Sequence, residues 1–333
     1  MVKAYAAMAQ GGALEAYEFD AGSLNADEVE IHVESCGICH SDLSMIDNEW
    51  GLSQYPLVAG HEIIGTVQAI GKDVESLAVG QKVGLGWQAG FCNHCHQCHT
   101  GDHNLCAESI PTIMNKGGFA ETVRASADAV IPLPAGLDAR SAGPLLCGGI
   151  TVFNPLVQFD IKPTDKVGVI GIGGLGHLAI QFLNAWGCEV TAFTSSEAKK
   201  AEALEMGAHH TLDSTKAEDL AAAANRFDYL LSTVNIPLDW NAYVGTLSPK
   251  GRLHFVGATL EPLDLNVFPL LMAQRSVSAS PVGSPETIKQ MLDFAVQHDI
   301  KPMVEYFPLS EVNDALDHLR SGKARYRVVL ENN

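Results

Sequence analysis

The feature that most constrains this chain is a short glycine turn between two apolar segments. Residues 166–170 (KVGVI) are mostly apolar, as in a strand that is buried on both faces of a parallel sheet. The next six residues, 171–176, have the pattern G-x-G-x-x-G. Apolar side chains then recur at 175, 178, 179, 182, 183 and 186, which is the spacing of one helix face. The order strand, glycine turn, helix predicts the first unit of a doubly wound α/β sheet.

Strand and helix patterns continue to alternate after this unit, while the chain before residue 135 differs. Its short alternating runs at 29–33, 63–67 and 118–123 predict an antiparallel, barrel-like, β-rich region. A length of 333 residues exceeds what one core usually holds, so we expect two domains. The other expected elements are strands at 189–193, 227–234, 252–257 and 327–330 and helices at 197–206, 291–295 and 312–319.

The glycine turn has the features of a dinucleotide-binding motif. Gly171 permits the tight turn, Gly173 allows the backbone to approach a pyrophosphate, and Gly176 allows helix and strand to pack closely. The N–H groups at the start of the helix, around Gly174 and Leu175, then face the phosphates. The alternative is a tight strand–helix turn that binds no ligand.

The residues after the second strand indicate which dinucleotide binds. An Asp or Glu at that point would hold the ribose 2′-hydroxyl of NAD. This chain instead has Thr194, Ser195, Ser196 and Lys199, which can bind a 2′-phosphate and do not repel it. The sequence therefore favours NADP. The alternative is that these residues cap the following helix, for which Ser196 is a good N-cap.

Four of the eight cysteines form a regular cluster. Cys92, Cys95, Cys98 and Cys106 lie within fifteen residues, a spacing typical of a structural zinc site with four thiolates. Disulfides and coincidence are the alternatives. The interspersed His94, His96, His99 and His103 could compete as ligands.

A second metal site is suggested by residues that are far apart in sequence. Cys39, His61 and Cys147 could supply the three protein ligands of a catalytic zinc, if the fold brings them together. Asp42 and Glu62 would then be carboxylates close to these ligands. The alternatives are cysteines that only pack in the core and a hydrogen-bonded core histidine.

Composition excludes several classes of function. There are 21 Lys plus Arg against 39 Asp plus Glu, so the formal charge is 21 − 39 = −18. Such an acidic chain repels nucleic-acid phosphates and anionic lipid, so we expect neither as a partner. No apolar run reaches the roughly 18 residues of a membrane span, and the N-terminus does not resemble a signal peptide. We therefore expect a cytoplasmic protein with reduced cysteines.

Several motifs together resemble one known family over nearly the whole chain. They are the four-cysteine cluster, GIGGLG at 171–176, CGICHSDL at 36–43, GHE at 60–62, LLCGGITVFNPL at 145–156 and GKARYRVVL at 322–330. The chain resembles the zinc-dependent medium-chain alcohol dehydrogenases, in particular the cinnamyl alcohol dehydrogenase branch. Within that branch it is similar to the bacterial broad-specificity NADPH-dependent aldehyde reductases.

The resemblance implies an architecture. Residues 1–147 and 284–333 would form a discontinuous GroES-like catalytic domain, and 148–283 a Rossmann NADP-binding domain. It places the active site in the cleft between the two domains. It also implies a homodimer.

The resemblance assigns roles to the metal-site residues. Cys39, His61 and Cys147 would bind the catalytic zinc, and Glu62 would be a transient ligand. The four-cysteine cluster would hold a structural zinc, which makes two zinc ions per chain. Cys36 and Cys188 have no role in the family.

The resemblance also implies how protons move. Ser41 would start a proton relay, and Asp42 would orient a zinc ligand. Plant members usually carry a histidine where this chain has Ser44, so the relay is expected to end at His40 or at the cofactor ribose.

The substrate side is implied by resemblance as well. The positions expected to border the nicotinamide are Thr151, Val256 and Gly257, and those expected to line the substrate pocket are Met45, Trp50, Leu52 and Trp87. Trp50 is bulkier than the aliphatic residue often found there, which argues against a strict role with lignin precursors. The tryptophans could alternatively only pack in the core.

The implied reaction is reversible hydride transfer between NADP(H) and a broad range of aliphatic and aromatic primary alcohols and aldehydes. One alternative is an NAD-dependent alcohol or polyol dehydrogenase of the same superfamily. Polyol enzymes commonly have an acidic residue at the position of Cys147, which this chain lacks. A non-catalytic protein that binds zinc or a dinucleotide is the other alternative. Zinc-free relatives lose the set Cys39, His61 and Cys147, which is present here.

Overall fold

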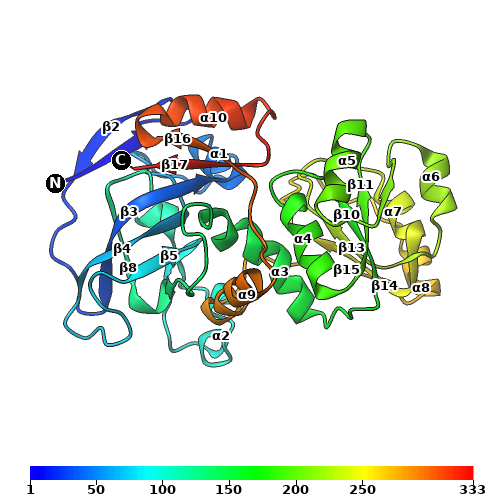
Figure 1. Cartoon of the computed structure of the whole chain (residues 1–333), viewed down its shortest axis with the longest axis horizontal. Helices are drawn as coiled ribbons and strands as arrows, with labels where there is room; N and C mark the ends of the chain where they lie inside the picture. Colours follow the sequence, from blue (N-terminus) through cyan, green and yellow to red (C-terminus); the bar gives the residue numbers. More distant parts are fainter. Residues whose placement is uncertain (333) are drawn as a thin grey trace. The chain divides into compact units, whose positions relative to one another are not determined.

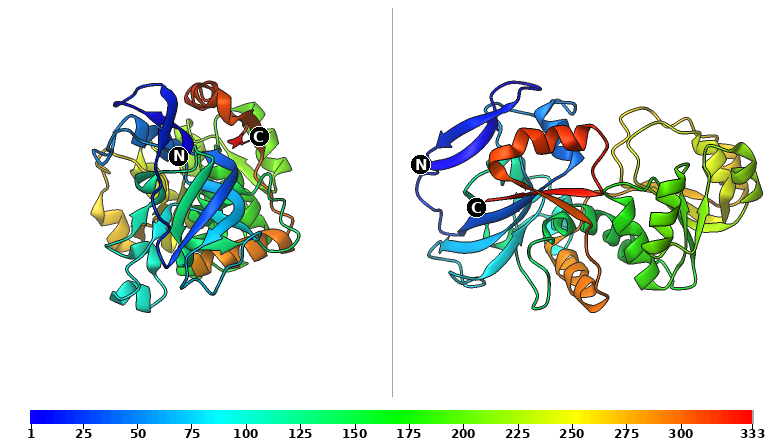
Figure 2. Two further views of the ribbon diagram at one scale, coloured as in Figure 1. Left: turned by 90° about the vertical axis from the view of Figure 1, so that its left-hand side faces the viewer. Right: turned by 45° about the horizontal axis from the view of Figure 1, so that its top comes forward.

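The computed structural model describes residues 1–332, which form two compact units. The terminal unit comprises Met1–Ile150 and the chain from Val282 onward, and the central unit is Thr151–Pro281. The expected boundaries after 147 and 283 differ from these by 150 − 147 = 3 and 283 − 281 = 2 residues. Both ends of the chain belong to the terminal unit, where Figure 2 marks them.

The terminal unit is built on a sheet that, within residues 1–332, has seven strands in the order β16-β17-β3-β4-β5-β9, with β8 also paired to β3. All neighbours are antiparallel except β16 and β17. The strands are β3 (Glu28–Ile38), β4 (Glu62–Ile70), β5 (Lys82–Leu85), β8 (Thr122–Ser126), β9 (Val130–Pro132), β16 (Val304–Pro308) and β17 (Arg327–Glu331). Two small sheets add β1 (Val2–Ala7) with β2 (Leu14–Phe19) and β6 (Gln88–Gly90) with β7 (Ile110–Pro111).

Strand β3 organises this unit because it pairs on both sides. Its first half alternates as predicted, with Val29, Ile31 and Val33 buried and His32 exposed. Its second half, residues 35–38, is buried throughout and pairs with both β4 and the C-terminal strand β17. Figure 1 shows β17, in red, beside β3, in blue. Strand β17 therefore lies next to the segment that leads into Cys39.

One predicted strand begins later than expected. The alternating run at 118–123 becomes strand only from Thr122, where β8 starts. The N–H groups of Gly118 and Phe119 instead donate to the carbonyls of Gly60 and Ala59, each at 2.9 Å. These two N–H groups are hydrogen-bonded to the loop before His61, so they are not available for pairing in the sheet.

The central unit confirms the doubly wound parallel sheet. Within the described chain its six strands are all parallel, in the order β12-β11-β10-β13-β14-β15. Numbered from β10, this is the order 3-2-1-4-5-6 of dinucleotide-binding sheets. The strands are β10 (Lys166–Ile170), β11 (Glu189–Phe193), β12 (His210–Leu212), β13 (Phe227–Ser232), β14 (Leu247–Phe255) and β15 (Ser276–Ala279).

Helices connect these strands and complete both units. Those of the terminal unit are α1 (His40–Ile46), α2 (His96–His99), α9 (Pro285–Gln297) and α10 (Val312–Arg320). The central unit contains α4 (Gly176–Trp186), α5 (Glu197–Glu205), α6 (Ala217–Ala222), α7 (Trp240–Thr246) and α8 (Val267–Met272), and α3 (Gly148–Gln158) begins in one unit and ends in the other. Over residues 1–332, every helix is too short or too polar to cross a lipid bilayer.

The glycine turn joins β10 to α4 as the sequence predicts. Gly171 follows the strand directly and has a φ of +89°, a conformation that glycine adopts readily. A Cβ at Gly176 would lie 2.0 Å from the carbonyl oxygen of Gly171. The last glycine is therefore required for close packing of helix on strand.

This contact predicts a stability difference between two Gly→Ala variants. Gly176→Ala forces α4 away from β10 and should destabilise the protein by about 1–3 kcal/mol, the usual cost of overpacking. Gly245→Ala is the matched control on α7, since a Cβ there meets no atom within 4 Å. It should be neutral or stabilising by up to about 1 kcal/mol. Urea unfolding measures both, and equal stabilities would contradict the packing argument.

Candidate functional site

Three elements of the terminal unit bring four candidate metal ligands together. Cys39 follows β3 and precedes α1. His61 directly precedes β4, and Glu62 is the first residue of that strand. Cys147 follows a 3₁₀ turn at Gly143–Leu146. One donor atom from each lies within 4.8 Å of the others, and all four residues are buried. Residues separated by up to 108 positions thus form one cluster.

The geometry of this cluster suits a zinc ion. Nε2 of His61 lies 3.2 Å from Sγ of Cys147, which lies 3.8 Å from Sγ of Cys39. The hydrogen bond between the two sulfurs lowers the pKa of Cys39 well below its usual range and raises that of Cys147. Two sulfurs and one imidazole nitrogen are the ligand set of a catalytic zinc site that keeps a fourth position open. The donor set therefore fits zinc.

Asp42 fixes the orientation of these ligands. Its buried carboxylate accepts the N–H of Cys39 at 2.8 Å and that of Gly60 at 2.8 Å, and it lies 3.0 Å from Nδ1 of His61. The first contact is local, because residue 42 is the third residue of α1 and reaches back to the residue before the helix. The last contact keeps the proton on Nδ1 and leaves Nε2 free to bind a metal.

Glu62 has a partner that the sequence analysis did not identify. Its carboxylate forms an ion pair with Arg327, the first residue of β17, and both side chains are buried. Burial raises the pKa of Glu62 to about 7, although Arg327 acts in the opposite direction. The signal in the sequence is a single charge at the start of the otherwise apolar run RVVL.

The predicted proton-relay residues lie at the start of α1. The hydroxyl oxygen of Ser41 is 3.7 Å from Sγ of Cys39. His40 is the first residue of the helix and is exposed. Ser44, which stands where plant relatives usually have histidine, is buried and donates to Glu49 at 2.7 Å. The hydroxyl of Ser41 is thus adjacent to a candidate metal ligand.

The four predicted pocket residues occupy different environments. The ring of Trp87 contacts that of His61 edge-on, with centroids 4.9 Å apart, and contacts Trp50 at 6.1 Å. Met45 is 2% exposed and belongs to the hydrophobic core, whereas Leu52 is 58% exposed. The two tryptophans thus form an aromatic wall next to the candidate metal ligand His61.

The four-cysteine cluster also comes together. One sulfur from each of the four residues lies within 4.8 Å of the others. Sγ of Cys98 is 3.5 Å from that of Cys95 and 3.9 Å from that of Cys92. A hydrogen bond from the backbone N–H of His94 lowers the pKa of the Cys92 thiol to about 6. Of the four interspersed histidines, only His94 joins a candidate group among residues 1–332, with Cys92 and Glu108.

In the central unit, the predicted NADP residues lie at the carboxyl ends of the strands. Thr194–Ser196 follow β11 directly, and Ser196 caps α5 by accepting the N–H of Lys199 at 3.4 Å. The hydroxyl of Thr194 accepts the N–H of Ser196 at 3.3 Å. The capping alternative therefore holds for Ser196. Ser195 is exposed.

The residues expected near a nicotinamide have two different placements. Val256 and Gly257 follow β14, and their N–H groups donate to the carbonyl of Ser232 at 3.0 and 3.2 Å. They lie at the same end of the sheet as Gly171. Thr151 is buried in α3. The glycine turn follows β10, and the strand order reverses between β10 and β13. Ligands of such sheets bind at the carboxyl ends of the strands at this point.

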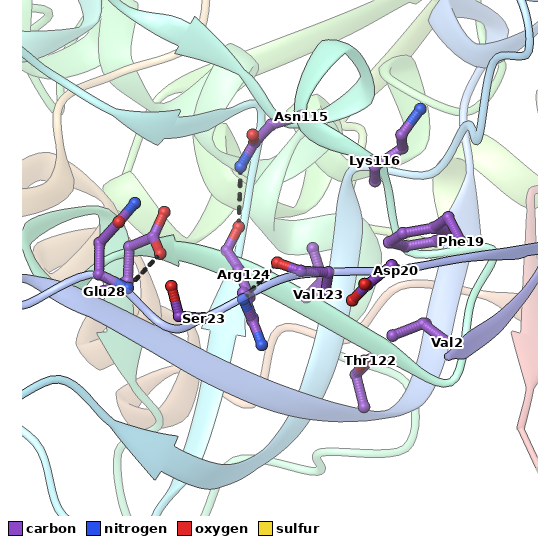
Figure 3. Close-up of a pocket in the computed structure, with 12 residues that line it drawn as sticks. Val2, Phe19, Asp20, Ser23, Glu28, Asn115, Lys116, Thr122, Val123 and Arg124 are labelled. Carbon is purple, nitrogen blue, oxygen red and sulfur yellow. Dashed lines mark hydrogen bonds between the residues drawn. The ribbon is translucent and has the colours of Figure 1, made fainter.

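Figure 3 shows a separate hollow of about 210 Å³ in the terminal unit. None of its lining residues is a predicted site residue. The guanidinium of Arg124 on its wall is already bound by Glu30 at 2.7 Å and by the carbonyl of Ala21 at 2.6 Å. The amide of Asn115 donates to the carbonyl of Arg124, as the figure shows. We assign no function to this hollow.

Comparisons with known proteins identify relatives of both units of the chain. Residues 25–135 match the alcohol dehydrogenase GroES-like domain, and 174–297 match the zinc-binding dehydrogenase family. The chain is 63% identical to the aldehyde reductase AdhA of Synechocystis over 99% of its own length and 98% of the relative. Among solved structures, a cinnamyl alcohol dehydrogenase of Sorghum bicolor superposes with a TM-score of 0.95 at 36% identity, covering 99% of this chain and 97% of that one.

A second solved structure is described as bound to a nucleotide. It is the CAD of Helicobacter pylori complexed with NADP(H), with a TM-score of 0.91 at 29% identity. The match covers 99% of this chain and 97% of that one. The likeness therefore extends over both units.

The contacts of Asp42 predict a specific effect on metal binding. Asp42→Asn replaces an acceptor of three N–H groups and should lower zinc affinity about 10- to 100-fold, as the loss of a group that orients metal ligands does. Asp47→Asn is the matched control, because Asp47 lies just after the same helix and pairs with Arg320 at the surface. It should leave zinc affinity unchanged. Competition with a chelator measures both, and equal affinities would contradict the role of Asp42.

Proposed function

This chain belongs to the zinc-binding alcohol dehydrogenases with a GroES-like domain, and we propose that it works mainly as an NADPH-dependent aldehyde reductase. The reaction interconverts aldehydes and primary alcohols. The observation that carries the proposal is the convergence of Cys39, His61 and Cys147 into an S₂N donor set. The 63% identity to an aldehyde reductase supports the reductive direction.

We further propose two zinc ions per chain. The S₂N set with its neighbouring carboxylate suits a catalytic ion, because three protein ligands leave one position for substrate. The four cysteines of the second cluster suit a structural ion, because four thiolates complete a tetrahedron. All eight cysteines are free thiols. This agrees with a reducing compartment, and we place the enzyme in the cytoplasm.

The residues around the first cluster suggest how the reaction proceeds. Bound there, zinc would act as a Lewis acid toward the carbonyl oxygen, and a reduced nicotinamide would supply the hydride. Ser41 donates its proton to the substrate oxygen as negative charge develops there. A proton would return to Ser41 from His40 or through the ribose of a bound cofactor, since the hydroxyl of Ser44 is directed to Glu49. Asp42 keeps His61 in the tautomer that the site requires.

The preference for NADP(H) rests on the residues after β11. Thr194, Ser195 and Lys199 offer hydroxyls and a cation, and no carboxylate is present at 194–196 to hold a ribose 2′-hydroxyl. The related enzyme of Helicobacter pylori was crystallised with NADP(H). Trp50 and Trp87 line the approach to the metal ligands and favour aldehydes with apolar substituents.

Initial rates test the proposed reaction and cofactor together. Purified protein should oxidise NADPH faster than NADH with butanal, octanal, benzaldehyde and cinnamaldehyde. Ser195→Asp should shift the NADPH-to-NADH ratio of kcat/KM at least about tenfold toward NADH, since its carboxylate repels the 2′-phosphate. Ser310→Asp adds the same charge at an exposed position of the other unit and should not change the ratio. A preference for NADH in the unaltered protein would refute the cofactor assignment.

We also propose a homodimer, formed through one face of the central unit. The residues of α8 are all at least partly exposed, and Val267, Phe268, Leu271 and Met272 are each 66–71% exposed. Strand β15, which follows α8 in the chain, is the edge of its sheet. Exposed apolar groups and an open strand edge are both typical of a subunit interface.

Charge substitutions on α8 test the interface. The protein should sediment at twice the 35.5 kDa mass of one chain. The double variant Phe268→Asp, Leu271→Asp should sediment as a monomer, because burying two carboxylates in an apolar interface is costly. Leu204→Asp is the control on α5, where Leu204 is 49% exposed, and should remain dimeric. A dimer in all three proteins would exclude this surface.

A further inference from the structure

The ion pair between Arg327 and Glu62 spans three strands. Arg327 begins β17 and Glu62 begins β4, and β3 lies between these two strands in the sheet. The guanidinium therefore crosses β3, where its Nη2 also lies 3.3 Å from the carbonyl of Ile38 and donates to it. Arg327 is 4% exposed and Glu62 is fully buried. A buried ion pair is weak evidence for stability alone, so a positional role is worth testing.

Gly37 makes this crossing possible. It lies opposite Glu62 in the pairing of β3 with β4, and a Cβ at Gly37 would lie only 2.1 Å from Oε2 of Glu62. The absence of a side chain thus leaves room for the carboxylate over β3. Oε2 of Glu62 has no hydrogen-bond partner within residues 1–332, and neither has Nε of Arg327. Such groups are rare in native proteins, and each calls for an explanation.

The position of Glu62 suggests what the ion pair controls. One of its carboxylate oxygens lies within 4.8 Å of the donor atoms of Cys39, His61 and Cys147. A carboxylate that joined these three would complete a tetrahedron and leave no position for an external ligand. We infer that Arg327 is a positioning residue that holds Glu62 by Oε1 and so keeps the fourth ligand position open. The inference rests on the proposed metal site.

The consequence is that Arg327 sets how freely small molecules reach the metal. With Arg327 present, Glu62 is bound by a cation and can approach the other three ligands only when this pair opens. Without Arg327, the carboxylate is buried beside a metal ion that is the nearest remaining positive charge. Glu62 then becomes a competitor of every external ligand.

Binding of imidazole to a cobalt-substituted protein tests this directly. Cobalt(II) is placed at the Cys39 cluster while the four-cysteine cluster retains zinc, and imidazole binding is followed in the visible spectrum. Arg327→Gln should bind imidazole at least about tenfold more weakly than the unaltered protein, and should release its cobalt to a chelator more slowly. Arg327→Lys retains the charge, and its imidazole affinity should lie between those of Arg327→Gln and the unaltered protein.

A double variant separates positioning from damage to the fold. Arg327→Gln combined with Glu62→Gln removes the competing carboxylate and should restore imidazole affinity to that of Glu62→Gln alone. If the role of Arg327 were merely structural, the double variant would bind imidazole at least as weakly as Arg327→Gln does. That result, or unchanged imidazole affinity in Arg327→Gln, would overturn the inference. Absence of the cobalt–thiolate absorption in the unaltered protein would instead refute the proposed metal site.

Discussion

The carboxylate of Asp42 is the contact on which the candidate metal site depends most. It accepts the backbone N–H groups of Cys39 and Gly60 and the Nδ1 proton of His61, and so joins two loops that are about twenty residues apart in sequence. A buried carboxylate that made fewer of these bonds would destabilise the fold, because each lost bond leaves a charge without compensation. The same bonds determine where Nε2 of His61 points. Stability of the loop and geometry of the site are therefore set by one group.

The local parts of this architecture could be predicted from the sequence. Strand β10, the glycine turn and strand β11 have the predicted bounds, because a buried strand followed by glycine and a helical pattern has few other solutions. The four-cysteine cluster also follows from spacing, since its members lie within fifteen residues. Such features depend on contacts between residues that are close in the chain, and the residue pattern describes these contacts well.

The non-local parts could not be predicted from pattern alone. Cys147 lies just before α3 and is 108 residues from Cys39, so their contact depends on how the whole unit folds. The residue pattern does not show this contact, and only the resemblance to a known family indicates the ligand set. Arg327 was missed because its partner Glu62 lies 265 residues away across another strand. Met45, expected to line the pocket, belongs to the same hydrophobic cluster against which Trp50 and Trp87 pack. Periodicity specifies which face is apolar but not what that face packs against.

We propose that Cys39, His61 and Cys147 hold a metal ion with an open position, separate from an ion in the four-cysteine cluster. The decisive measurement is anomalous X-ray diffraction from crystals of the purified protein, recorded on both sides of the zinc absorption edge. Two zinc peaks per chain are expected, one bounded by these three side chains and one by the four sulfurs. A single peak at the four sulfurs, with no density between Cys39 and Cys147, would refute a catalytic zinc site.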